Sequence, residues 1–163
     1  MNRPTIGRSL RSPLLAIALV AGVAGTALAT GATGFHPSIQ ARGTATEHVH
    51  FNTGAIKFQT KANVDFVNAT VDIDPSASSG WHSHPGVVLV TVAAGTVTFY
   101  DEHCVATVHP TGTSFVESGD APGLARNESA STAARVYAVY LVPAGTPNSA
   151  LRVDAANPGC PQS

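Results

Sequence analysis

The chain has 163 residues, with nine basic and ten acidic side chains and a formal net charge of -1 at neutral pH. Charges of both signs are scattered along it, which excludes a basic stripe for nucleic acid and an acidic tail for a basic partner. This length is typical of one globular domain.

The N-terminal segment has the three parts of a secretory signal peptide. Arginines precede an uncharged apolar run over residues 14–28, and the small-residue pattern Ala-Leu-Ala closes the segment at Ala29. A bilayer span needs about 20 strongly apolar residues, whereas this run is shorter and rich in Ala and Gly. We therefore predict that residues 1–29 are cleaved after Ala29, that the protein is secreted or periplasmic, and that no stable membrane span remains.

The next segment, residues 30–46, is rich in Gly, Ala and Thr, and we predict that it is a flexible lead-in to a folded domain over residues 47–163. In that domain helical periodicity is almost absent, while short alternating runs separated by turn residues recur. The predicted strands cover residues 48–60, 63–73, 87–92, 96–100, 104–109, 114–117, 124–127 and 135–142, with one of the breaks at Pro75. About eight strands at this spacing predict an antiparallel sandwich or jelly roll.

Two histidines lie at the start of a predicted strand. His82 and His84 are followed by a valine-rich run over residues 87–92. Residues two apart on an extended segment share a face, so both imidazoles can point at one metal ion. Neutral imidazole is the commonest protein ligand for transition metals, so the pair predicts half of a coordination shell. The alternative is a chance pair on a solvated strand.

The histidine pair and its surroundings resemble the first motif of the cupin superfamily, in which an H-x-H unit is followed by a glutamate and a closing glycine. His82, His84 and Gly95 fit this motif, and Gly112 and Asn127 fit the two ends of the second cupin motif. The resemblance implies an all-β fold, a single-domain cupin-type antiparallel β-barrel or jelly roll. It also implies a metal at the barrel mouth.

The resemblance covers residues 71–127 and departs from the family pattern at two ligand positions. The glutamate position falls on Val88, and the third histidine falls on Gly123. A bound metal therefore needs a replacement ligand, and the nearest carboxylates in the sequence are Glu117 and Asp120. The alternatives are a solvated acid at the end of a strand for Glu117 and a turn aspartate for Asp120.

A site of His82, His84 and Glu117 suits a divalent transition metal such as Mn, Fe, Ni, Cu or Zn. Two imidazoles and one carboxylate leave open coordination positions for a substrate or water. Val88, Val90 and Val92 share the face of the two histidines if the strand is regular, so the histidine pair is predicted to lie above an apolar barrel interior that could accept a small-molecule ligand.

The aromatic residues near this region have a plainer interpretation. We predict that Phe99, Phe115, Tyr137 and Tyr140 pack in the core or at the rim rather than stacking on a substrate. Trp81 points away from the histidines, and we predict that it covers the edge of a sheet.

The two cysteines, Cys104 and Cys160, both lie in the part predicted to be exported. In an oxidising compartment such a pair is most simply a disulfide, which would attach the C-terminal tail to the strand region after Tyr100. A free catalytic thiol at Cys104 is the alternative, with His103 as the neighbouring base.

Three functions remain open at this level. The first is a metal-binding cupin with a small-molecule ligand or substrate. The second is a non-catalytic small-molecule binding or sensing module whose metal site has degenerated, and the third is a structural protein of the cell envelope. The cupin resemblance implies oxygen-dependent cleavage, isomerisation or Lewis-acid chemistry, but one fold hosts many activities. The sequence leaves open whether the protein is an enzyme and whether it forms a homodimer.

Overall fold

The computed structural model describes residues 31–162, and the predicted signal peptide, residues 1–29, lies outside them. The strands are β1 (Thr33–Ala45), β2 (His50–Asn52), β3 (Lys57–Gln59), β4 (Val64–Ser78), β5 (His82–Ser83), β6 (Val87–Ala94), β7 (Thr96–Tyr100), β8 (Ala106–Pro110), β9 (Ser114–Ser118), β10 (Leu124–Arg126), β11 (Ala134–Pro143) and β12 (Val153–Asp154). A 3-10 turn, η1 (Asn148–Ala150), precedes β12. Across residues 31–162, no helix has the length and apolar character needed to cross a membrane.

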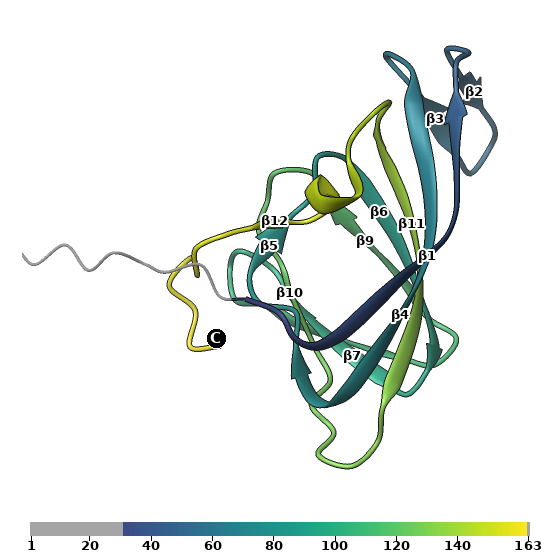
Figure 1. The fold of residues 1–163 in the computed structure, drawn as a ribbon. Helices are drawn as coiled ribbons and strands as arrows, with labels where there is room; N and C mark the ends of the chain where they lie inside the picture. The colour runs from purple at the N-terminus through teal and green to yellow at the C-terminus, as the bar shows by residue number, and fades with distance from the viewer. Residues whose placement is uncertain (1–30, 163) are drawn as a thin grey trace, which may run out of the picture.

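Eight strands form one antiparallel sheet that curls into a nearly closed barrel (Figure 1). Its order is β8-β7-β10-β4-β11-β6-β9, and β1 pairs with β4 outside this path. The short strands β5 and β12 pair with each other beside the barrel, and β2 pairs with β3. The all-β barrel predicted from the sequence is therefore confirmed.

Strands β4, β11 and β6 form the wall that buries most of the core. Each alternates inward apolar side chains with outward exposed ones, as a strand with one face on a core must. Val88, Val90 and Val92 of β6 all point inward and are at most 4% exposed, as the sequence predicted. Some inward-facing side chains of the wall are small. Ala138 of β11 pairs with Ala69 of β4 on one side and with Val90 of β6 on the other.

Residues 33–45 differ from the predicted flexible lead-in, because they form strand β1 along almost the whole of β4. Pairing with β4 satisfies the backbone of this segment, and Phe35 packs against the core. Arg42 and Thr44 of β1 both donate hydrogen bonds to the Asp65 carboxylate of β4. A strand exposed on its outer face needs few large apolar residues, so composition gave no sign of it.

The predicted strand over residues 48–60 is also different, since it is a hairpin of β2 and β3. Its turn is closed by a hydrogen bond of 2.7 Å from the Thr53 amide to the Ile56 carbonyl, and the Thr53 hydroxyl accepts a bond from the Ile56 amide. Turn residues Asn52, Thr53 and Gly54 explain the reversal. The hairpin extends beyond one end of the barrel (Figure 1).

The break predicted at Pro75 is a bulge within β4 rather than an end. Ile73 pairs with Phe35 and Ser78 pairs with Thr33, so extra residues of β4 are left between the two pairs. Ser76 has a positive φ of 58°, which turns the chain at the bulge. Proline is tolerated there because a bulge residue need not donate to the ladder.

The glycine that closes the first motif is required by its position between β6 and β7. Gly95 has a φ of +72°, and a Cβ added there would lie 2.6 Å from the Ala133 carbonyl oxygen. Any other residue would be strained by the backbone and would collide with the start of β11.

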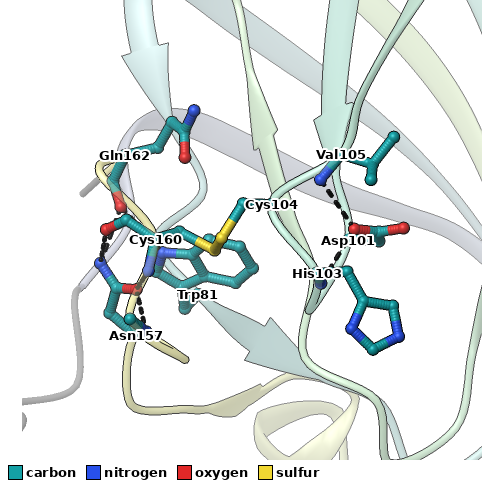
Figure 2. Close-up of a disulfide and its surroundings, with 9 residues drawn as sticks. Trp81, Asp101, His103, Cys104, Val105, Asn157, Cys160 and Gln162 are labelled. Atoms are coloured by element: carbon teal, nitrogen blue, oxygen red, sulfur yellow. Dashed lines mark hydrogen bonds between the residues drawn. A yellow bond between two sulfur atoms is a disulfide. The ribbon is translucent and has the colours of Figure 1, made fainter.

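A disulfide between Cys104 and Cys160 attaches the C-terminal tail to the barrel (Figure 2). It packs with Trp81 and Leu124, both of which are fully buried. The Trp81 indole N-H donates to the Gln162 carbonyl at 3.1 Å, so the tail covers the tryptophan. The predicted pairing of the cysteines is confirmed, and a free thiol at Cys104 is excluded.

Replacing both Cys104 and Cys160 with alanine should lower the free energy of unfolding by about 4 kcal/mol, because the bond closes a loop with a sequence separation of 56. Urea unfolding followed by the fluorescence of Trp81, the single tryptophan, measures this change. His103→Ala, an exposed neighbour of the disulfide, is the control and should leave the midpoint unchanged. An unchanged midpoint in the double alanine variant would contradict the role given to the disulfide.

The Asp65→Asn variant should lower the melting temperature, because Asp65 connects β1 to β4. Hydrogen bonds from Thr44 and Arg42 and from the Gly145 amide lower the pKa of the Asp65 carboxyl from 3.8 to about 2, outweighing its desolvation. The stabilisation is complete above the unfolded pKa and is lost as the pH falls through the folded pKa.

The difference in melting temperature between wild type and Asp65→Asn should therefore shrink as the pH falls from about 4 to about 2. Thermal unfolding followed by circular dichroism over this range is the measurement. Asp120→Asn, at an exposed turn, is the matched control. A difference that does not change with pH would contradict the assignment.

Candidate metal centre

The structure brings together His82, His84 and Glu117, the three residues predicted as metal ligands. One side-chain donor atom from each lies within 4.8 Å of the others. The Glu117 Oε2 atom is 3.4 Å from His82 Nε2 and 3.1 Å from His84 Nε2. Both imidazoles are buried, and the Glu117 side chain is only 12% exposed. The alternative interpretation of Glu117 as a solvated acid is therefore wrong.

The histidine segment is held by backbone bonds on several sides. β5 pairs with β12, which sets His82 opposite Asp154. On its other side, the His82 amide donates to the Gly123 carbonyl at 3.0 Å, and the Gly123 amide donates back at 2.8 Å. The His84 amide donates to the Gly119 carbonyl at 3.2 Å. A two-residue strand is rigid here because its neighbours take up its hydrogen bonds.

Backbone carbonyls also determine how the two imidazoles are oriented. His82 Nδ1 lies 2.9 Å from the Gly80 carbonyl oxygen, and His84 Nδ1 lies 2.6 Å from the Leu151 carbonyl oxygen. A carbonyl only accepts, so each Nδ1 must carry the proton that it donates. In the neutral imidazole, the lone pair is then on Nε2, which faces Glu117 in both residues.

Glu117 lies directly across from the position at which the first motif lacks its glutamate. Val88, at the position of that glutamate, pairs directly with Glu117 across β6 and β9. Directly opposite residues of an antiparallel pair point to the same face, with Cβ atoms about 4.5–5.5 Å apart. The carboxylate is thus supplied from the neighbouring strand at the same level of the barrel.

The position of the missing third histidine is filled by an aromatic ring. A Cβ added at Gly123 would lie 2.4 Å from Cζ of Phe99, so a side chain there would require the Phe99 ring to move. Asp120, the second candidate carboxylate, lies in an exposed turn outside the group. Among residues 31–162 the candidate donor set therefore has two imidazoles and one carboxylate.

Glu117 and two groups near it, Tyr140 and Arg152, have shifted pKa values. Burial raises the pKa of the Glu117 carboxyl, but when the two imidazoles are protonated at Nε2 the hydrogen bonds and charges of His82 and His84 outweigh burial and bring the pKa to about 2. Burial together with the Glu117 charge raises the pKa of the Tyr140 hydroxyl to about 12. Burial lowers the pKa of Arg152, against the effect of Glu117. Glu117 is therefore ionised and Tyr140 neutral at physiological pH.

The three residues lie between two cavities. The larger, of about 340 Å³, occupies the barrel interior and is lined mostly by apolar side chains of β1, β4, β6 and β11. The smaller, of about 190 Å³, lies on the side of the loop over residues 118–123 and is also lined by Asp101 and Glu102. A metal held by the group could be reached from both sides.

Sequence reasoning missed two residues that line the larger cavity beside the histidines, Tyr140 and Arg152. Tyr140 was predicted as packing, and its ring does lie edge-on to His84, with ring centroids 5.6 Å apart. Arg152 gave no signal, because it reaches the site only through the fold of the C-terminal tail. Tyr137, also predicted as core or rim, is 53% exposed on the outer face.

No protein-family model matches the chain, and no curated protein matches it. Similar solved structures include an RmlC-like cupin from Shewanella frigidimarina, at 12% identity and a TM-score of 0.47 over 69% of this chain and 79% of that one. A conserved protein with a double-stranded β-helix domain from Klebsiella pneumoniae is 18% identical, with a TM-score of 0.46 over 55% of this chain and 74% of that one.

A conserved protein of unknown function from Streptococcus pyogenes is 19% identical, with a TM-score of 0.44; the match covers 48% of this chain and 65% of that one. Three features of the structure itself describe the fold. They are the strand order of the sheet, the closure of the sheet into a barrel, and the position of the histidine pair beside the barrel interior. On these features the chain is a single antiparallel β-barrel.

Proposed function

We propose that this protein is an exported metal-binding barrel, in which His82, His84 and Glu117 hold one divalent transition metal beside a cavity for a small-molecule ligand. The metal would be Mn, Fe, Ni, Cu or Zn, the ions that imidazole and carboxylate ligands suit. When bound, such an ion supplies Lewis-acid polarisation of a ligand oxygen at its open coordination positions.

The observation that carries the proposal is the meeting of three electron-pair donors in a buried site. With Nδ1 of each imidazole bonded to a carbonyl, both Nε2 lone pairs face the Glu117 carboxylate. Lone pairs facing one another in a site of low dielectric repel unless a cation lies between them. A proton on one imidazole removes the repulsion between that Nε2 atom and the carboxylate only, whereas a metal ion binds all three donors together.

The two separations from the Glu117 carboxylate agree with this interpretation. Ligand atoms about 2.0–2.2 Å from one ion lie roughly 3.0–3.5 Å apart at tetrahedral or octahedral angles. The two separations from Glu117 Oε2, 3.1 and 3.4 Å, fall in that range. The Nδ1 bonds to Gly80 and Leu151 are the outer contacts that orient histidine ligands in metal sites.

Export is supported by two features. Residues 1–29 have the layout of a signal peptide, and the Cys104–Cys160 disulfide is of the kind that persists in oxidising compartments. The metal would then be acquired outside the cytoplasm, or during export.

Metal content tests the proposal directly. The mature protein from Thr30, purified without chelator, should contain about one equivalent of a transition metal by elemental mass spectrometry. His82→Ala/His84→Ala should contain none, and Glu117→Gln should bind the same metal at least about 10-fold more weakly, since losing a ligand costs no less than losing a residue that orients one.

The chain offers a matched control in a second H-x-H pair at the exposed start of its hairpin region. His48→Ala/His50→Ala removes the same number of imidazoles at the same spacing and should keep the full metal content. Equal loss of metal in both double variants would indicate that the metal binds at the protein surface rather than at the buried group. Absence of metal from wild type, even after incubation with each of the five ions, would overturn the proposal and favour a metal-free binding module.

A further inference from the structure

The larger cavity is divided into an apolar part and a polar end. Its inner part is lined by side chains such as Ala69, Ala125, Ala138 and Val90, each at most 6% exposed. The alanines leave space because Ala69 and Ala138 face each other across β4 and β11, where larger residues would fill the barrel. An apolar cavity of this kind favours an apolar occupant over water.

The polar groups of the cavity gather where the histidines lie. Tyr140 lines the cavity beside His84, and within residues 31–162 its hydroxyl makes no hydrogen bond. Arg152 also lines it, held by a hydrogen bond of 2.6 Å to the Ser79 carbonyl and by an ion pair with Asp154. A ligand at this end would meet a free hydroxyl donor and a guanidinium.

The charges at this end favour one negative charge on the ligand. Glu117 and Arg152 line the cavity, and Asp154, which does not line it, pairs with Arg152, so these three side chains carry a net charge of -1. A divalent ion changes this to +1, which a single anionic group neutralises. A second anionic group deeper in the barrel would find only apolar neighbours, and burying it there is costly.

We propose that the ligand of this site is an amphipathic monoanion, whose apolar body fills the barrel and whose single acidic oxygen group binds the metal beside Tyr140 and Arg152. This inference rests on the proposed metal site. Its body is limited in size, because a 150 Å³ apolar cavity admits benzene, so the 340 Å³ here admits roughly twelve non-hydrogen atoms. Medium-chain carboxylates and small aryl carboxylates have this form.

Calorimetric titration of the zinc-loaded mature protein with acetate, butyrate, hexanoate and octanoate tests the apolar part. Each added methylene should raise the affinity about fourfold, the effect of burying one such group. Adipate, which is hexanoate with a second carboxylate at the far end, should bind at least about tenfold more weakly than hexanoate. Hexanol, which lacks the anionic group, should also bind more weakly than hexanoate.

Two variants locate the ligand in the barrel. Ala138→Leu fills the cavity and should weaken octanoate binding at least about tenfold while leaving acetate binding unchanged. Ala106→Leu, the same change at an exposed position of β8, should leave both affinities unchanged. If Ala138→Leu does not fold, the homologous series and the adipate comparison in wild type decide the question.

The outcomes separate this inference from the proposed function. Zinc uptake with equal affinity along the series, or with adipate binding as well as hexanoate, would overturn the inference and leave the metal site standing. Failure to take up any metal would overturn both the metal site and the binding of the acidic group to it. A rise in affinity with chain length that Ala138→Leu abolishes would support the inference.

Discussion

The hydrogen bonds from His82 to the Gly80 carbonyl and from His84 to the Leu151 carbonyl control the chemistry of this barrel. In the neutral imidazoles they leave both Nε2 lone pairs facing the Glu117 carboxylate in a buried position, and either protons or the proposed metal ion would remove the repulsion between these donors. One of these carbonyls is close in sequence to its histidine, whereas Leu151 comes from the C-terminal tail. The disulfide and the pairing of β5 with β12 therefore matter to the site as well as to stability.

The candidate donor set has a carboxylate, although the sequence motif lacks one at the expected position. The usual glutamate position holds Val88, yet Glu117 supplies a carboxylate from the directly opposite position of β9. At Gly123, by contrast, Phe99 occupies the space in which a third histidine would lie. The result is a smaller donor set with an aromatic wall, which leaves more of a metal ion's coordination sphere open to a ligand.

Strand β1 links the fold to the ligand cavity. By pairing with β4 it closes one side of the barrel, and Phe35, Pro37 and Ile39 line the cavity. The Asp65 carboxylate secures this strand through Arg42 and Thr44. An apolar interior ending at a few charged groups is the arrangement that would orient the proposed amphipathic ligand, because body and head are each favoured at only one end.

The sequence by itself determined the all-β class, most inward-facing positions of β6 and the histidine pair, because period-two alternation and residue spacing are local properties. It also placed the disulfide, since two cysteines allow one pairing. Only the tertiary structure decided that residues 33–45 are a strand, that Glu117 faces the histidines and that Arg152 lies at the cavity. Those features depend on pairing between β1 and β4, on the register of β6 against β9 and on the path of the C-terminal tail. Contacts between residues distant in sequence leave no periodic signal along the chain.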